Sequence, residues 1–436
     1  MASPPSYPLG SVAASQLDVS QTLPDYARTV SSEWDVPAAD QLHHFHLARK
    51  TGERWLTLTM TSRAATAEAT PLFFQGGNVT GSLKLHLEKE ELVDEISIDL
   101  YGRLTIFSHS TSNFLRMAQN TYSAADKPPE SLEPSLTTAK RGRLKGRYDW
   151  PYSFRLPKGV SILSSITPDG ESERKSYRLP PSFRDEQSNV DVQYSLVVRV
   201  NRGGFRKANK LVVPFDYVPL ARPSPPTILR QLAYQQDAEI VGPEGDPEGW
   251  KSFDPIKIEG VLFKKVPVKA LCRLSVARPL TYTRGTPIHL MMCISSDNEQ
   301  LLDLLTPQSI YLVVVQRTTF GDDNRPLFSR RLSAQITVKS QIRATAKWWK
   351  FSSSNPAPST RAFAGELLVP ADLPPACQIL HYGHEYEFAF TSLSAVGFTP
   401  TAPSKNAFLT EPINIVTAFS QGARPRSYIP PEYNIS

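Results

Sequence analysis

Period-two alternation of apolar and polar residues runs through most of this chain and constrains its fold more than any other feature. Val190 to Val200 carries an apolar residue at every second position, and Ile96 to Ile106 repeats the pattern. Successive side chains of a β-strand point to opposite faces, so these stretches place one set in a core and the other in water. The spacing returns in Val268 to Val276 and in Tyr386 to Phe390. Many strands separated by Pro and Gly turns predict antiparallel β-sandwiches.

The composition is that of a globular chain with several domains. Its 436 residues predict two or three domains, each able to bury its own core. We expect no membrane span, since no apolar run reaches the required length, and no secretory signal at the N-terminus. The three cysteines fit a reducing cytosol, and we expect Cys272 and Cys293 to be buried as small hydrophobes, while Cys377 is the third. A net charge of +6 does not indicate a nucleic-acid partner.

A Pro- and Gly-rich break divides the strand-rich sequence into two halves. Arg222 to Pro226 and Val241 to Gly249 have the composition of a linker, with a brief helix predicted between them from Ile228 to Ala238. A second short helix is predicted from Glu299 to Leu305, and the polar stretch from Ser123 to Gly146 is predicted to be a long loop. The linker therefore separates two domains of similar size.

The two halves repeat one local pattern, in which a strand ends at a proline and a Leu-Pro-Pro turn leads into another strand. Leu179-Pro-Pro181 is the turn in the first half, and Leu373-Pro-Pro375 is its counterpart in the second. This repetition predicts two copies of one sandwich. Pro180-Pro181-Ser182-Phe183 is similar to a PPxY motif, but its place in this turn predicts a structural role.

The first half resembles the arrestin N-terminal domain, in the α-arrestin-like group found in fungi. The second half resembles the arrestin C-terminal domain more loosely, through Tyr282-Thr-Arg-Gly285 and the repeated Leu-Pro-Pro turn. The stretches that carry the first resemblance are Gly77 to Gly81, Leu83 to Leu87, Ile96 to Gly102, Trp150 to Pro157, Leu179 to Phe183, Val192 to Val198 and Leu211 to Tyr217. Together the two resemblances cover about residues 45 to 420.

The resemblance implies an all-β fold of two tandem immunoglobulin-like, arrestin-type β-sandwich domains with disordered terminal tails. The expected segments are an N-terminal segment 1–40, a first sandwich 41–222, a linker 223–255, a second sandwich 256–420 and a C-terminal tail 421–436.

Two PPxY tetrapeptides lie near the two ends of the chain. Pro4, Pro5 and Tyr7 belong to the first copy, and Pro430, Pro431 and Tyr433 belong to the second. A PPxY segment fits a WW domain, because its prolines favour the polyproline II helix that the aromatic groove of the domain binds. The C-terminal copy is the stronger candidate, since Pro8 directly follows the N-terminal one. These residues predict that WW domains bind the chain.

Together the motifs and the resemblance imply an adaptor that recruits a WW-domain HECT-type ubiquitin ligase to a membrane transporter or receptor for ubiquitination and endocytosis. We expect a cytoplasmic protein recruited to the plasma membrane or endosomes. Three alternatives stay open: a trafficking scaffold of arrestin fold that uses no ligase, a signalling arrestin that reads phosphorylated tails, and an enzyme on a β-sandwich. The usual catalytic motifs are absent from the sequence, so no enzyme activity and no cofactor are expected.

One basic cluster and one histidine cluster are the remaining candidate sites. The basic cluster contains Lys140, Arg141, Arg143, Lys145 and Arg147. It is either a solvated loop or a binding site for anionic lipid or phosphorylated cargo, and a nuclear-localisation role is a further reading. The histidine cluster contains His43, His44 and His46, and no Cys, Asp or Glu stands at ligand spacing beside it, so no metal site is expected.

Overall fold

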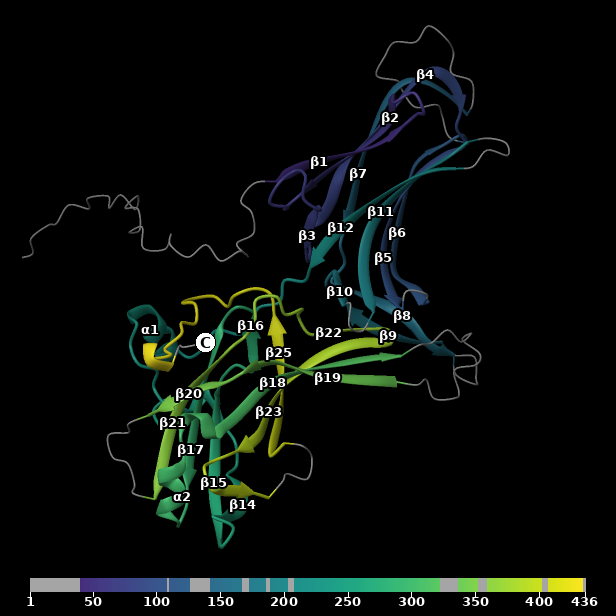
Figure 1. Cartoon of the computed structure of the whole chain (residues 1–436). Coiled ribbons are helices and arrows are strands. Elements are labelled where there is room, and N and C mark those ends of the chain that lie inside the picture. The colour runs from purple at the N-terminus through teal and green to yellow at the C-terminus, as the bar shows by residue number, and fades with distance from the viewer. Residues whose placement is uncertain are drawn as a thin grey trace, which may run out of the picture. The chain divides into compact units, whose positions relative to one another are not determined.

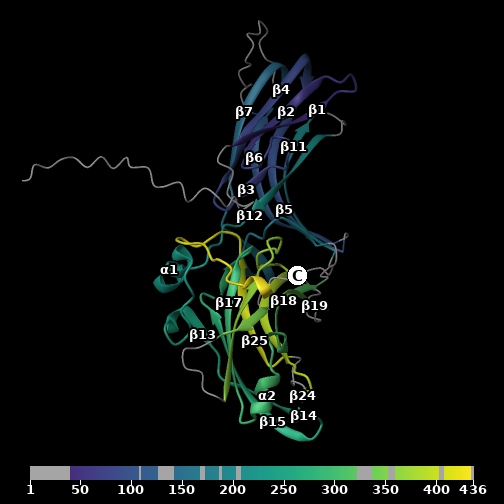
Figure 2. The same ribbon diagram turned by 60° about the vertical axis from the view of Figure 1, so that its left-hand side comes forward.

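The folded part of the chain is almost entirely β, and its strands form two sandwiches (Figure 1). The computed structural model describes residues 40–107, 110–125, 142–166, 172–185, 189–202, 208–321, 336–351, 359–401 and 407–433. Figure 2 shows the same two groups of strands from another side. The predicted all-β class with two sandwiches is therefore confirmed.

The first sandwich pairs a four-stranded sheet with a larger one. The smaller sheet has the order β1 (Gln41–Ala48), β2 (Arg54–Ser62), β4 (Asn78–Leu92) and β7 (Arg143–Arg155). The larger sheet has the order β3 (Leu72–Phe74), β12 (Asn209–Val218), β11 (Val190–Asn201), β5 (Glu95–Ile106) and β6 (Ser110–Ser123), and β10 (Phe183–Asp185) pairs with β11. A separate hairpin is made of β8 (Gly159–Ile166) and β9 (Ser172–Arg178).

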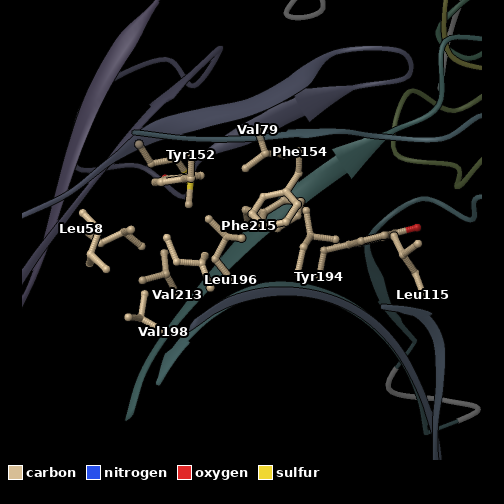
Figure 3. Close-up of a cluster of buried hydrophobic side chains, with 14 of the residues drawn as sticks. Leu58, Val79, Leu115, Tyr152, Phe154, Tyr194, Leu196, Val198, Val213 and Phe215 are labelled. Atoms are coloured by element: carbon tan, nitrogen blue, oxygen red, sulfur yellow. The ribbon is translucent and has the colours of Figure 1, made fainter. Parts of the chain in front are cut away.

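The core of the first sandwich consists of the inward-facing residues of that alternation. In the register of β5 with β11, Leu100 lies opposite Leu196, and both are fully buried. Figure 3 shows how side chains from several strands meet in this core, including Leu58, Val79, Tyr152, Phe154, Tyr194, Val213 and Phe215. Burying one large apolar side chain contributes roughly 1.5–3 kcal/mol, so the alternation itself supplies much of the stability.

The second sandwich also contains two sheets. One has the order β20 (Lys347–Lys350), β21 (Thr360–Leu368), β17 (Pro287–Ser295), β15 (Val266–Ala277), β14 (Ile256–Leu262) and β24 (Phe398–Pro400), and β13 (Trp250–Ser252) pairs with β15. The other has the order β16 (Thr281–Thr283), β25 (Leu409–Val416), β23 (Tyr382–Leu393), β18 (Ile310–Gly321) and β19 (Ile336–Thr345), and β22 (Cys377–Ile379) pairs with β23.

The larger sheet of the first sandwich and the second of these sheets have the same topology. In each, a three-residue strand pairs in parallel with the last strand of its sandwich, and the remaining neighbours are antiparallel. The two Leu-Pro-Pro turns lead to β10 and β22, which pair in the same way with β11 and β23. The predicted duplication is thus confirmed for the strand order of one sheet in each sandwich.

The short helices and the Leu-Pro-Pro turn agree with the sequence, and one cysteine does not. α1 (Ile228–Gln236) and α2 (Glu299–Leu304) form where helices were predicted. Pro180 and Ser182 accept hydrogen bonds from the Tyr194 hydroxyl and the Tyr217 amide, which confirms the structural role of that turn. Cys293 is exposed, contrary to expectation, because its neighbours at the inward positions of β17 are apolar and turn it to the outer face.

Candidate functional site

The chain after β25 runs back along the linker and the second sandwich. The Ala418 amide donates to the Ala221 carbonyl at 3.0 Å, and the Thr417 hydroxyl donates to the Pro219 carbonyl. Further on, the Arg426 guanidinium lies 3.6 Å from the Asp237 carboxylate at the end of α1. The segment lies beside α1 in both ribbon views (Figures 1 and 2). As far as residue 433, the predicted free tail is therefore a docked segment, which is a correction.

Glu366 of β21 is the point at which the C-terminal segment docks. Its carboxylate is 1% exposed and accepts hydrogen bonds from the Ser427 hydroxyl at 2.7 Å and from the Tyr428 amide at 2.5 Å. The Nδ1 atom of His289 lies 3.2 Å from the same carboxylate. A buried charge is costly unless hydrogen bonds satisfy it, and two of these three donors come from the C-terminal segment. The carboxylate thus fixes the position of Ser427 and Tyr428.

Two tyrosine rings pack against His289, and burial determines the protonation state of its side chain. The Tyr428 ring meets the His289 ring edge to face at 5.6 Å, and its hydroxyl donates to the Ala233 carbonyl at 3.1 Å. Tyr234 lies on α1, and the centre of its ring is 5.6 Å from that of the His289 ring. Burial lowers the pKa of His289, against the opposing effect of Glu366, and burial raises the pKa of Tyr428. His289 is therefore neutral near pH 7 and donates through Nδ1–H to Glu366.

The C-terminal PPxY motif begins two residues after Tyr428 and forms a tight turn. Pro431–Tyr433 is a short 3₁₀ helix, η5, in which the Tyr433 amide donates to the Pro430 carbonyl at 2.9 Å. This turn lies alongside β20. Pro431 is exposed, whereas Pro430 and Tyr433 are half-buried. A polyproline II segment has no internal hydrogen bonds, so the motif has to leave this turn before it can enter the groove of a WW domain.

Five of the other predicted site residues lie in parts of the chain that the structure does not describe. Pro4, Pro5 and Tyr7 of the N-terminal motif lie outside the described residues, as do Lys140 and Arg141.

Three predicted basic residues belong to a strand rather than to a loop. Arg143, Lys145 and Arg147 alternate along the start of β7 and are exposed on one face of that edge strand. The physical reason is that Leu144 and Tyr148, at the alternate positions, are buried in the core and draw the segment into the sheet. The three cations therefore form a fixed row, and the Arg143 guanidinium lies 3.8 Å from Glu90.

A second group of cations was not predicted from the sequence, because its members lie on three different strands. The guanidinium groups of Arg103, Arg116 and Arg199 lie 5.0, 5.9 and 5.4 Å from the centre of the Tyr101 ring. Asp99, which is buried, pairs with Arg116 and Arg199. Two of the three cations thus share one carboxylate, while the Arg103 guanidinium donates to the Asn113 side chain. The only hint in the sequence is the alternation of Asp99, Tyr101 and Arg103 along the outer face of β5.

The histidine cluster makes structural contacts. His43 is buried, and its Nε2 atom lies 2.8 Å from the Ser62 hydroxyl on β2. His44 and His46 stack on each other with ring centres 6.4 Å apart. Within the described ranges, no group of three His, Cys, Asp or Glu side chains is placed to hold a metal ion. No helix in that part of the chain combines the length and the apolar character needed to cross a bilayer.

The chain matches no protein-family model, and no curated protein matches it.

Proposed function

We propose that this chain is an arrestin-like adaptor that recruits a WW-domain HECT-type ubiquitin ligase to membrane protein cargo for ubiquitination and endocytosis. The observation that carries this proposal is the pair of PPxY motifs, one near each end of the chain. The exposed Pro431, on the surface of the second sandwich, supports it, because a partner can begin contact there. Two β-sandwiches in tandem are the scaffold that the sequence resemblance implies.

In this mechanism the chain acts by tethering. A ligase held by its WW domains has a raised effective concentration near the lysines of the bound cargo. Single PPxY contacts bury little surface, so two motifs that engage two WW domains of one ligase gain affinity from avidity. The adaptor itself needs no catalytic residue and no cofactor.

Recognition of phosphorylated or acidic tails is a second candidate function. It is supported by the three arginines around Tyr101, two of which share the single carboxylate of Asp99. Arginine binds phosphate with paired, charge-assisted hydrogen bonds, so such a group suits an anionic partner. On this reading the PPxY motifs are incidental.

The test is binding of the full-length protein to a panel of WW domains from HECT-type ligases. We expect the wild type to bind, Tyr433→Ala to lose most of the affinity, and Tyr7→Ala combined with Tyr433→Ala to lose at least tenfold, because the tyrosine fills its own groove on the domain. Circular dichroism of each variant checks that the sandwiches are intact. A wild-type protein that binds none of these domains would overturn the proposal in favour of a trafficking scaffold that uses no ligase.

A further inference from the structure

The C-terminal PPxY motif follows directly after the two residues that hold the segment on the second sandwich. Ser427 and Tyr428 both donate to the buried carboxylate of Glu366, at 2.7 and 2.5 Å. Tyr428 also reaches the Ala233 carbonyl on α1 and packs against His289. Only Ile429 separates this anchor from Pro430. The anchor therefore determines where the motif lies.

The docked motif has a conformation that a WW domain does not bind. The hydrogen bond that the Tyr433 amide donates to the Pro430 carbonyl closes a turn, and Tyr433 is half-buried beside β20. A WW domain needs the prolines in an extended polyproline II helix and the tyrosine free to enter its groove. Binding to the domain and docking on the sandwich thus exclude each other.

From this geometry we infer that the outer face of the second sandwich around Glu366 is a binding surface for the chain's own Ser427–Tyr433 segment, which competes with WW domains for the C-terminal motif. The inference rests on the proposed function for its consequence, but the docking can be measured by itself. When the segment leaves, water can replace the hydrogen bonds that Ser427 and Tyr428 donate to the Glu366 carboxylate.

Competition in cis lowers the apparent affinity for the partner. If the motif is undocked for a fraction of the time, the apparent dissociation constant is the intrinsic one divided by that fraction. With the motif undocked about one tenth of the time, the full chain binds a WW domain about tenfold more weakly than the free segment does. A negative charge at Ser427, facing the Glu366 carboxylate, opens the surface by repulsion.

The experiment compares the full-length protein with a peptide of residues 420–436 for binding to one WW domain. The protein carries Tyr7→Ala, so that only the C-terminal motif can bind the WW domain. We expect the peptide to bind about tenfold more tightly than the protein, and Ser427→Glu in the protein to recover most of that difference. The peptide with the same substitution is the matched control, because it reports any direct effect of the new charge on the WW domain. Equal affinities of protein and peptide, or no gain from Ser427→Glu, would overturn the inference.

Hydrogen exchange separates a failure of this inference from a failure of the proposed function. A peptide that binds no WW domain argues against the proposed function and leaves the docking to be judged by exchange. In the docked segment the Tyr428 amide is bonded to Glu366 and should exchange slowly, and Glu366→Ala or Ser427→Glu should speed its exchange at least tenfold. A Tyr428 amide that exchanges at the rate of a free peptide would refute the docking.

Discussion

His384 is a buried histidine whose protonation state follows from two hydrogen bonds. Its Nε2 atom lies 2.5 Å from the Pro375 carbonyl, which only accepts, and its Nδ1 atom lies 3.0 Å from the Tyr382 hydroxyl. The neutral ring therefore carries its proton on Nε2 and accepts from Tyr382. Burial lowers the pKa of His384 to about 4, against the hydrogen bond to Pro375. The folded protein thus resists protonation of this residue.

This residue makes the stability of the protein depend on pH. The unfolded chain binds a proton at His384 near its ordinary pKa of 6.5, so below that pH it holds more protons than the folded state. The free energy of unfolding should fall by about 2 kcal/mol between pH 7.5 and pH 5 through this group. Urea unfolding at both pH values measures it, with His384→Gln as the control that removes this part of the pH dependence.

An equal pH dependence in His384→Gln and in the wild type would show that other groups carry the effect. His289 is one such group, since burial lowers its pKa as well.

The Leu-Pro-Pro turns are the element that the two sandwiches share most closely. The Tyr194 hydroxyl of β11 donates to the Pro180 carbonyl at 2.7 Å, and the Tyr386 hydroxyl of β23 donates to the Pro374 carbonyl at 2.7 Å. Both rings are buried. Each tyrosine fixes the turn that precedes the short neighbouring strand, so the same contact positions β10 and β22.

Removing either hydroxyl should destabilise its own sandwich by a similar amount. Tyr194→Phe and Tyr386→Phe each leave a buried carbonyl without its donor, which costs about 1–3 kcal/mol of unfolding free energy. Tyr311→Phe, at a position that is 42% exposed, is the control and should change stability by less than about 0.5 kcal/mol. Denaturant titration measures all three, and a loss in only one of the two buried variants would contradict the equivalence of the turns.

The strands could be predicted from single stretches of sequence, whereas their partners could not. Val190 to Val200 and Ile96 to Ile106 alternate strictly, and they became β11 and β5. The pairing of Leu100 with Leu196 depends on contacts across 96 positions of chain, which local alternation does not encode. The same limit explains why the arginines around Tyr101 were missed.

The candidate site was predicted only in part for a related reason. The PPxY motif is a local signal and was found directly. Its docking depends on Glu366, a charged residue on the outer face of β21, and nothing near it in the sequence points to Ser427 or Tyr428. A polar segment rich in proline is typical of a free tail. Here hydrogen bonds to Glu366 hold the segment on the second sandwich instead.

At the scale of the whole molecule, the two sandwiches share apolar contacts. The Phe183 ring stacks on Tyr382 of β23 with centres 5.2 Å apart, and Phe107 meets Phe320 of β18 edge to face at 5.5 Å. Tyr382 and Phe320 belong to the same buried cluster as the core of the first sandwich. Aromatic pairs of this kind contribute about 0.5–1.5 kcal/mol beyond their buried area, so they couple the sandwiches.

The central claim, that this chain recruits a ligase through its two motifs, is tested most directly by calorimetric titration of the full-length protein with a tandem WW fragment of a HECT-type ligase. We predict a one-to-one complex that is at least tenfold tighter than the complex with a single WW domain, because the second contact is intramolecular. Either Tyr7→Ala or Tyr433→Ala should reduce the affinity to that of a single domain. Absence of binding, or an affinity that the double substitution leaves unchanged, would contradict the claim.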